Sequence, residues 1–244
     1  MIVDLKMIAA VRERAAAAKK EGYHSQLFYP KDVSDGETVE LKFLPPVDGQ
    51  MLLPTLLNVK FGVLKSGLSP NFTTRFSQNF PFSKDGECAL IDAIHAIEND
   101  PEQRIAHATA LSQVRQEYNF IQPVLVLDVK ANDETGDVEA YAIRDNEVKF
   151  LVLTSRQVEE VTALMDSRDA KNDDGNVYSW AKGRNISLRR KGKEKDTKYT
   201  FGLVSKPLVI KEEAFKAPVD TYAYIKTQIQ SDEKLLEVFV KYFG

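Results

Sequence analysis

The residues with the clearest chemical character lie in one basic stretch, residues 178–201. This stretch contains the only tryptophan of the chain, Trp180, and only two acidic residues, Glu194 and Asp196. Cations neutralise phosphates and flat rings stack on unpaired bases, so the combination predicts a surface for single-stranded nucleic acid. The eight basic residues are Lys182, Arg184, Arg189, Arg190, Lys191, Lys193, Lys195 and Lys198.

Two simpler interpretations of the same stretch stay open. Lysine-rich hairpin tips form solvated strand edges that discourage aggregation, and runs of charge commonly mark solvated faces. In that case Trp180 is an ordinary core residue. The binding interpretation therefore depends on what the rest of the chain adds.

The element that must position these cations is a β-hairpin. Period-two segments at residues 186–188 and 199–201 flank a basic tip that contains glycine, which is the pattern of two paired strands. Further strand patterns cover residues 39–44, 52–63, 118–129 and 138–144, and the last two are joined by a turn at 132–137.

Helical patterns lie between and around these strands. Asp100 and Pro101 predict the start of one helix, and Thr154 with Gln157 forms a capping box that predicts the start of another. The N-terminal helix packs either on its own domain or on a neighbouring molecule. The expected helices cover residues 2–20, 87–98, 101–116, the segment after Thr154, and the segment from residue 222 with a break near Ser231.

The arrangement of these patterns predicts the fold class. Helices inserted among at least five short strands, without regular alternation, favour an α+β fold in which a small β-barrel is decorated with inserted helices and with N- and C-terminal helices. We expect a helical arm at residues 1–21, a barrel core at 22–206 with a helical insertion around 86–117, and a strap with a helical segment at 207–244.

Four phenylalanines crowd residues 71–82, a segment that is too rich in polar residues and proline for a regular element. These rings either plug the nearest core or line a path for stacked bases, with Arg75 on phosphate. Arg75 and Phe76 are therefore candidate contacts with nucleic acid.

The composition limits what else the chain does. The formal net charge is −3 at pH 7, so the basic stretch means that positive charge is segregated. A single cysteine, Cys88, excludes an intramolecular disulfide framework and fits a reducing compartment. The sequence shows no secretory leader and no apolar run of membrane-spanning length, so we expect a cytoplasmic protein that does not contact membranes.

Motifs of the common enzyme and metal sites are missing. The sequence has no glycine-rich phosphate loop, no nucleophile elbow and no His-Glu-x-x-His. Cys88 and His95 can share a helix face, but two ligands do not complete a structural zinc site. We therefore expect a protein that is not an enzyme and has no cofactor. An enzyme built from the scattered carboxylates is the alternative.

Four segments, taken in order, are similar to motifs of one protein family. Residues 39–45 end in Leu-Lys-Phe-Leu-Pro, and residues 118–120 are Tyr-Asn-Phe shortly before Val-Leu-Val. Residues 137–141 precede a Lys-Phe pair and a capped helix, and residues 180–188 resemble Trp-x-x-Gly-x-Asn-Phe-x-Leu. Over about residues 36–201 the chain resembles the single-stranded DNA-binding, helix-destabilising proteins of T-even-type bacteriophages.

The resemblance implies an OB-fold whose cleft binds one DNA strand. That family has a zinc subdomain with one histidine and three cysteines, of which this chain keeps only Cys88, so we expect no zinc. The rings implied to hold the strand are Tyr118, Phe120, Tyr141, Tyr178 and Trp180. The cations implied on its backbone are Arg144, Lys182, Arg184, Arg189, Arg190 and Lys191, to which the basic stretch itself adds Lys193 and Lys198.

The function implied by the resemblance is sequence-independent binding of single-stranded DNA during phage-type replication, recombination or repair, in the host cytoplasm. Where the family has a long acidic tail, this sequence has a helical pattern that ends at Gly244. We therefore expect replication proteins to bind through the C-terminal helix, and self-association to use the N-terminal helix. The alternatives are an OB-like interaction module that recruits a polymerase or transcription component, and an RNA-binding protein.

Overall fold

A computed structural model describes residues 26–50, 52–61, 73–76, 89–131, 138–167, 177–179, 183–204, 213–229 and 231–244. The helix expected at residues 2–20 and the turn expected at 132–137 lie outside the described residues. Cys88, Trp180 and Lys182 also lie outside them.

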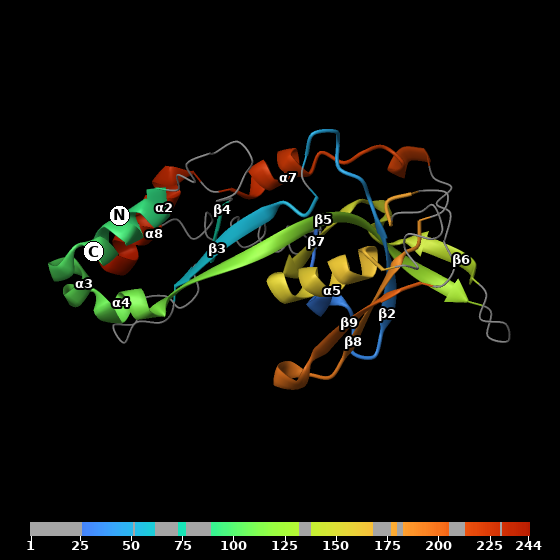
Figure 1. The fold of residues 1–244 in the computed structure, drawn as a ribbon, viewed down its shortest axis with the longest axis horizontal. Coiled ribbons are helices and arrows are strands. Elements are labelled where there is room, and N and C mark those ends of the chain that lie inside the picture. The colour runs from blue at the N-terminus through green and yellow to red at the C-terminus, as the bar shows by residue number, and fades with distance from the viewer. Residues whose placement is uncertain are drawn as a thin grey trace, which may run out of the picture.

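The strands of the described part form a single curled sheet (Figure 1). Its main path runs β1-β7-β5-β2-β8-β9, while β3 and β6 pair with β5, and β4 pairs with β3. The six strands of the main path form a strongly curled half-barrel, so the expected mixed α+β class is confirmed. The strands are β1 (Leu27–Phe28), β2 (Thr38–Phe43), β3 (Thr55–Phe61), β4 (Thr73–Phe76), β5 (Val114–Ala131), β6 (Val138–Ile143), β7 (Lys149–Thr154), β8 (Ile186–Lys191) and β9 (Lys198–Leu203).

Helices cover the sheet in separate places. Helix α5 lies over the half-barrel, and α7 lies beside another part of the sheet (Figure 1). Among the described residues, the other four α-helices gather at one end and form what we call the helical lobe, namely α2, α3, α4 and α8. The α-helices are α2 (Ala89–Asn99), α3 (Pro101–Ala106), α4 (Ala108–Gln113), α5 (Ser155–Met165), α7 (Thr221–Gln228) and α8 (Asp232–Phe243).

The 18-residue strand β5 holds the two parts of the molecule together. Its residues 114–120 pair with β3 beside the helical lobe. Residues 119–124 pair with β7, residues 124–127 pair with β2, and residues 127–131 pair with β6. A single continuous strand therefore fixes the position of the half-barrel relative to the helical lobe.

The inside of the half-barrel is a continuous apolar core. Strands contribute alternate side chains to it, and α5 closes it with the fully buried Val161. Burial of such side chains contributes about 1.5–3 kcal/mol each. The buried residues of this core include Val39, Leu41, Phe43, Val124, Val126, Leu151, Leu153, Ile186, Leu188 and Phe201.

The helical lobe has a second core. Helix α8 packs on α2, and the ring of Tyr242 lies 4.6 Å from that of Phe61 in β3. The predicted break near Ser231 is confirmed, since α7 ends before it and α8 begins after it. Within α8, Leu235 and Phe243 are buried, whereas Leu236 and Val240 are exposed.

The local signals for helix starts are confirmed at both capping sites. Asp100 Oδ1 accepts hydrogen bonds from the amides of Glu102 and Gln103, at 2.9 and 3.1 Å. Thr154 and Gln157 form the reciprocal capping box at the start of α5, with distances of 2.9 and 3.4 Å. No helix in the described ranges is both long enough and apolar enough to cross a lipid bilayer.

Two predictions of local structure were wrong. The helix expected over residues 101–116 is interrupted at His107 and ends at Gln113, and β5 begins immediately afterwards. The segment 71–82, expected to be irregular, contains β4. Both errors have the same cause, because pairing with β3 supplies backbone hydrogen bonds that local propensity does not reveal.

Candidate nucleic-acid interface

Side-chain alternation along β8 separates its apolar residues from its cations. Ile186 and Leu188 are buried in the half-barrel core, whereas Arg189 and Lys191 are exposed. Successive side chains of a strand point to opposite faces of a sheet. From Ser187 onward, the odd-numbered positions of β8 therefore lie on the outer face, opposite the core.

Strand β9 adds to this outer face. The register pairs Arg189 with Thr200 and Lys191 with Lys198. Like charges placed directly opposite each other on paired strands repel. A bound anion relieves this repulsion, so the position between Lys191 and Lys198 favours an anion. We call this surface the basic face, defined by Arg189, Lys191 and Lys198.

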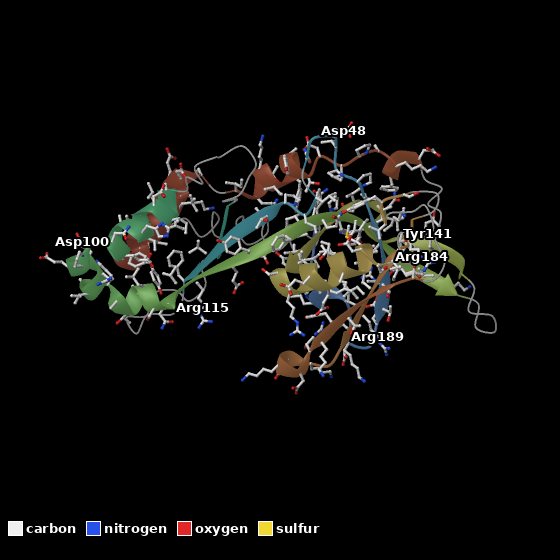
Figure 2. All side chains as sticks on the ribbon, in the orientation of Figure 1. Asp48, Asp100, Arg115, Tyr141, Arg184 and Arg189 are labelled. Atoms are coloured by element: carbon white, nitrogen blue, oxygen red, sulfur yellow. The ribbon has the colours of Figure 1, made fainter. Side chains whose placement is uncertain are left out.

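The hairpin tip continues the basic face. Lys193 and Lys195 are exposed, the first just before and the second within the short 3-10 turn Glu194–Asp196. Within the described part of the chain, no ion pair joins these two lysines or the cations of the basic face to a carboxylate. Figure 2 shows Arg189 on the projecting hairpin, far from Asp100 of the helical lobe.

The outer face continues from β8 onto β2, the neighbouring strand towards the middle of the sheet. Its residue Thr38 pairs with Arg189, and Glu40 pairs with Ser187. The Glu40 carboxylate accepts a hydrogen bond of 2.9 Å from Asn185 Nδ2, so it is tied to the start of β8. Alternation then places Lys42 on the same face, two residues beyond Glu40.

Lys42 is a functional candidate that the sequence analysis did not identify. Its side chain is fully buried, and its Nζ donates to the carbonyl oxygens of Ser179 at 2.6 Å and Gly183 at 2.9 Å. A longer contact of 3.4 Å reaches the carbonyl oxygen of Val177. Burial lowers the pKa of Lys42 to about 8. The alternating pattern of β2 indicated the face of this lysine, but no local signal indicated what covers it.

The contacts of Lys42 tie two backbone positions to the end of the outer face, namely Ser179 and Gly183. The amide of Gly183 also donates to the carbonyl oxygen of Ser179, at 3.0 Å. Trp180 and Lys182 lie between these two residues in the sequence and outside the described residues. Ser179 and Gly183 therefore lie beside the face of the sheet that carries the basic cations.

Tyr178, expected to stack on bases, packs against the core. Its ring centroid lies 6.2 Å from that of Phe43, and its hydroxyl donates to Gln122 Oε1 at 3.1 Å. Burial raises the pKa of the Tyr178 hydroxyl. Phe120 is also partly buried against this core. Both rings therefore contribute to packing in this structure.

Tyr141 lies on the outer face, at some distance from the cations. It pairs with Val129, two residues beyond Leu127, and Leu127 pairs with Glu40 of β2. Strands β6 and β8 are separated by β5 and β2, a distance of about 14 Å at the usual strand spacing. Tyr141 is partly buried against a third apolar cluster that includes Leu127.

Two of the predicted phosphate ligands are engaged within the protein. Arg144 Nη2 contacts Asp128 Oδ1 at 2.5 Å and Glu37 Oε1 at 2.8 Å, and its hydrogen bond to Asp128 raises the pKa of Arg144. Arg190 Nη1 donates to the carbonyl oxygens of Lys31 at 2.7 Å and Val33 at 3.0 Å. Arg184, two residues before the first residue of β8, is partly buried.

Tyr118 and Phe76 are brought together in another region. Both residues pair with Leu57 of β3, so the three positions form one row across β4, β3 and β5. Tyr118 is 40% exposed. Alternation along β5 puts Tyr118 on the face of Phe120, opposite the basic face. Arg75 pairs with Asn58 of β3, one position along from this row.

A cavity of about 430 Å³ adjoins the basic face, between the start of α5 and the edge strand β9. Lys198 and Thr200 belong both to this cavity and to the outer face of β9. Arg156, on the α5 side, lies 3.4 Å from Glu160 and is 89% exposed. The cavity therefore continues the cationic surface around the sheet edge. It is lined by Thr154, Arg156, Gln157, Glu160, Thr197, Lys198, Tyr199 and Thr200.

The described residues contain no group of three or more histidine, cysteine or carboxylate side chains placed to hold a metal ion. His95 is exposed on α2, 4.0 Å from Glu98, and Cys88 lies outside the described part. No protein-family model matches this chain, and a search of curated proteins found no significant relative.

Proposed function

We propose that this protein binds single-stranded DNA without sequence preference and is not an enzyme. The observation that carries the proposal is the basic face. Arg189, Lys191 and Lys198 are exposed on one side of a projecting hairpin, and no carboxylate within the described residues pairs with them. Such cations are available to neutralise phosphates, which supplies most of the affinity in sequence-independent binding.

The geometry of the hairpin supports an extended single strand as the ligand. Alternate side chains on one strand are spaced about 6.8 Å apart, a spacing that suits successive phosphates of an extended polynucleotide. Trp180, the only tryptophan of the chain, lies in the sequence between Ser179 and Gly183, whose carbonyl oxygens contact Lys42 of β2. Stacking of an unpaired base on a ring adds about 1–3 kcal/mol, which a closed duplex does not gain.

The wider role follows from the family resemblance. The curled sheet and its covering helix are consistent with a small barrel, and we propose that the barrel is an OB-fold. The proposed role is the protection and straightening of single-stranded DNA during phage-type replication, recombination or repair. In this role the basic face binds the phosphates of the DNA backbone, and the protein binds along the strand without recognising its base sequence.

The test is the salt dependence of oligothymidylate binding. In one variant Arg189, Lys191 and Lys198 are changed to Glu. A matched control changes Arg104, Lys234 and Lys241 to Glu, which alters the net charge equally at exposed positions of the helical lobe.

Loss of three phosphate contacts flattens the slope of log affinity against log salt by about 2. We expect this change in the hairpin variant and a much smaller one in the control. Equal slopes in the two variants would contradict the proposal. Parallel titrations with duplex DNA and with single-stranded RNA test the preference for unpaired strands and for DNA.

A second candidate function is an interaction module that binds a protein partner through the terminal helices. The observation in its favour is the exposure of two apolar side chains of α8, Val240 at 63% and Leu236 at 40%. Removal of the C-terminal helices does not separate the two functions, because α7 and α8 contribute buried residues to two cores. The substitution Val240→Glu is the cleaner test. It leaves DNA affinity unchanged if the basic face is the DNA site.

A further inference from the structure

We propose that the bound DNA strand passes from Lys198 around the free edge of β9 and places a phosphate in the cavity beside the start of α5. The inference rests on the proposed function, which it extends by a further phosphate site and by a path for the strand across the sheet edge. It assigns a DNA contact to Arg156, a residue outside the basic face.

The cavity lies between two parts of the half-barrel that are not neighbours in the sheet. Residues 154–160, from the end of β7 and the start of α5, line one side, and residues 197–200 of β9 and the position before it line the other. Its volume of about 430 Å³ is in the range of small-ligand sites. Its lining consists mainly of hydroxyl, amide and charged groups, which suits a phosphate with its sugar better than an apolar ligand.

The edge of β9 presents backbone groups to this cavity. Among the described residues β9 pairs only with β8, where Tyr199 is opposite Arg190. The Arg190 backbone is engaged on its other side, because its carbonyl oxygen accepts from the Gly36 amide at 2.9 Å and its amide donates to the Glu37 carbonyl oxygen at 3.2 Å. Arg190 and Tyr199 are therefore a non-hydrogen-bonded pair, and the Tyr199 amide points away from β8.

The Tyr199 amide is consequently a hydrogen-bond donor at the free edge of the sheet. Tyr199 itself lines the cavity. Backbone amides are frequent donors to phosphate oxygens in protein–DNA complexes, and such contacts position the strand without recognising its bases. A donor of this kind agrees with binding that is independent of sequence.

Cations from two separate elements meet at the cavity. Lys198 of β9 is exposed on the basic face and also lines the cavity, so one lysine belongs to both surfaces. Arg156 of α5 is 89% exposed, and its Nε lies 3.4 Å from Glu160 Oε1. Exposed pairs of this kind are weak, and the guanidinium group has five N–H donors. Arg156 is therefore able to bind a phosphate without the loss of a buried contact.

The first experiment measures oligothymidylate binding by Arg156→Gln at several strand lengths and salt concentrations. The matched control is Arg104→Gln, at an exposed position of the helical lobe. Strands of about 4 to about 16 nucleotides cover the usual range of site sizes. For the longer strands we expect Arg156→Gln to flatten the slope of log affinity against log salt by about 0.7 and to lower affinity about 1.5- to 5-fold. The shortest strands fit on the hairpin alone and are expected to bind unchanged.

The second experiment uses Glu160→Gln, which removes a negative charge from the same cavity. We expect this variant to bind the longer strands more tightly, because it releases Arg156 and ends the repulsion of a phosphate. Glu159→Gln is the matched control, since Glu159 is exposed on the same helix and does not line the cavity. A merely structural role of the ion pair predicts a change in the same direction for Arg156→Gln and Glu160→Gln, because either substitution breaks the pair.

Three results would overturn the inference. They are equal effects of Arg156→Gln on short and long strands, changes in the same direction for the two cavity variants, and no difference between these variants and their controls. The last result, together with binding of a peptide strand, would assign the free edge of β9 to a protein partner. If the hairpin variant weakens binding while the cavity variants do not, only the path through the cavity fails. If the wild-type protein does not bind DNA, the proposed function fails and the inference fails with it.

Discussion

At the scale of single residues, the cations of the hairpin divide into those that are exposed and those that are hydrogen-bonded within the protein. Arg189 is exposed on the outer face, whereas its neighbour Arg190 donates to the carbonyl oxygens of Lys31 and Val33. Position in the strand decides the difference, because alternation turns the two side chains to opposite faces. A basic run in a sequence is therefore not equivalent to a basic surface.

Substitution of these two arginines is expected to have opposite effects. Arg190→Ala leaves two carbonyl oxygens without their donor and lowers the free energy of unfolding by about 1–3 kcal/mol, with no change in the salt slope of DNA binding. Arg189→Ala changes stability by less than about 0.5 kcal/mol and flattens the slope by about 0.7. Denaturant unfolding and salt titrations measure both quantities, and a reversed pattern would contradict the assignment.

Lys42 predicts a pH dependence of stability. Its pKa is about 8 in the folded state, against 10.5 for an exposed lysine. Between these values the unfolded chain binds more protons than the folded protein, so stability rises with pH, by up to about 1.4 kcal/mol per pH unit. Below about pH 8 both states are protonated and this contribution is constant.

Lys42→Met removes this titration and provides the reference. The stability of the wild type relative to Lys42→Met is expected to be constant from pH 6 to 7 and to increase from about pH 8 to 10. Urea unfolding of both proteins across this range measures the difference. If the stability of the wild type relative to Lys42→Met falls as pH rises, the lowered pKa of the buried Lys42 is contradicted.

At the scale of elements, the β8–β9 hairpin depends on the backbone of its tip. Gly192 has a φ of +93°, and a Cβ atom there would lie 2.5 Å from the carbonyl oxygen of Asp196. The Gly192 amide also donates to Asp35 Oδ1 at 2.8 Å. The tip that presents Lys193 and Lys195 therefore requires glycine at this position.

Gly192→Ala is expected to destabilise the protein by about 1–3 kcal/mol, because the left-handed backbone and the close carbonyl both oppose a side chain. Gly49→Ala is the matched control, since Gly49 has a φ of +82° but open space around its Cβ position. Thermal unfolding compares the two variants. Equal losses of stability would show that the close contact at the tip has no energetic effect.

Elements with strong local signals were predictable from the sequence. The hairpin strands, the capped start of α5 and the break before α8 all follow from patterns within a few residues. The start of β5 and the existence of β4 were not predictable from the sequence, because the pairing of these strands with β3 joins segments that are distant in the chain. In the candidate site, the basic stretch of the sequence indicated Arg189 as one candidate among several cations, whereas the internal engagement of Arg144 and Tyr178 depends on tertiary contacts.

At the scale of the whole molecule, the C-terminal helices are part of the fold. Tyr242 and Phe243 of α8 are buried against Phe61 and the α2 side chains of the helical lobe. Ile225 of α7 is buried against Phe150 and its neighbours. The segment expected to bind replication proteins therefore also completes two apolar clusters.

This packing predicts a strong contrast between two neighbouring positions of α8. Tyr242→Ala removes a buried ring and is expected to lower the free energy of unfolding by about 3–5 kcal/mol. Val240→Ser, at a position that is 63% exposed, is expected to change it by less than about 0.5 kcal/mol. Denaturant unfolding measures both. Similar values for the two variants would contradict the packing of α8 on the helical lobe.

The most direct test of the central claim is lysine footprinting of the intact protein with and without saturating oligothymidylate. An amine-reactive label, read by mass spectrometry, reports the accessibility of each lysine. We predict that Lys191, Lys193, Lys195 and Lys198 are protected by the oligonucleotide while Lys234 and Lys241 of α8 are labelled equally in both samples. Unchanged labelling of the hairpin lysines on DNA that is demonstrably bound, or protection confined to α8, would contradict the assignment of the basic face.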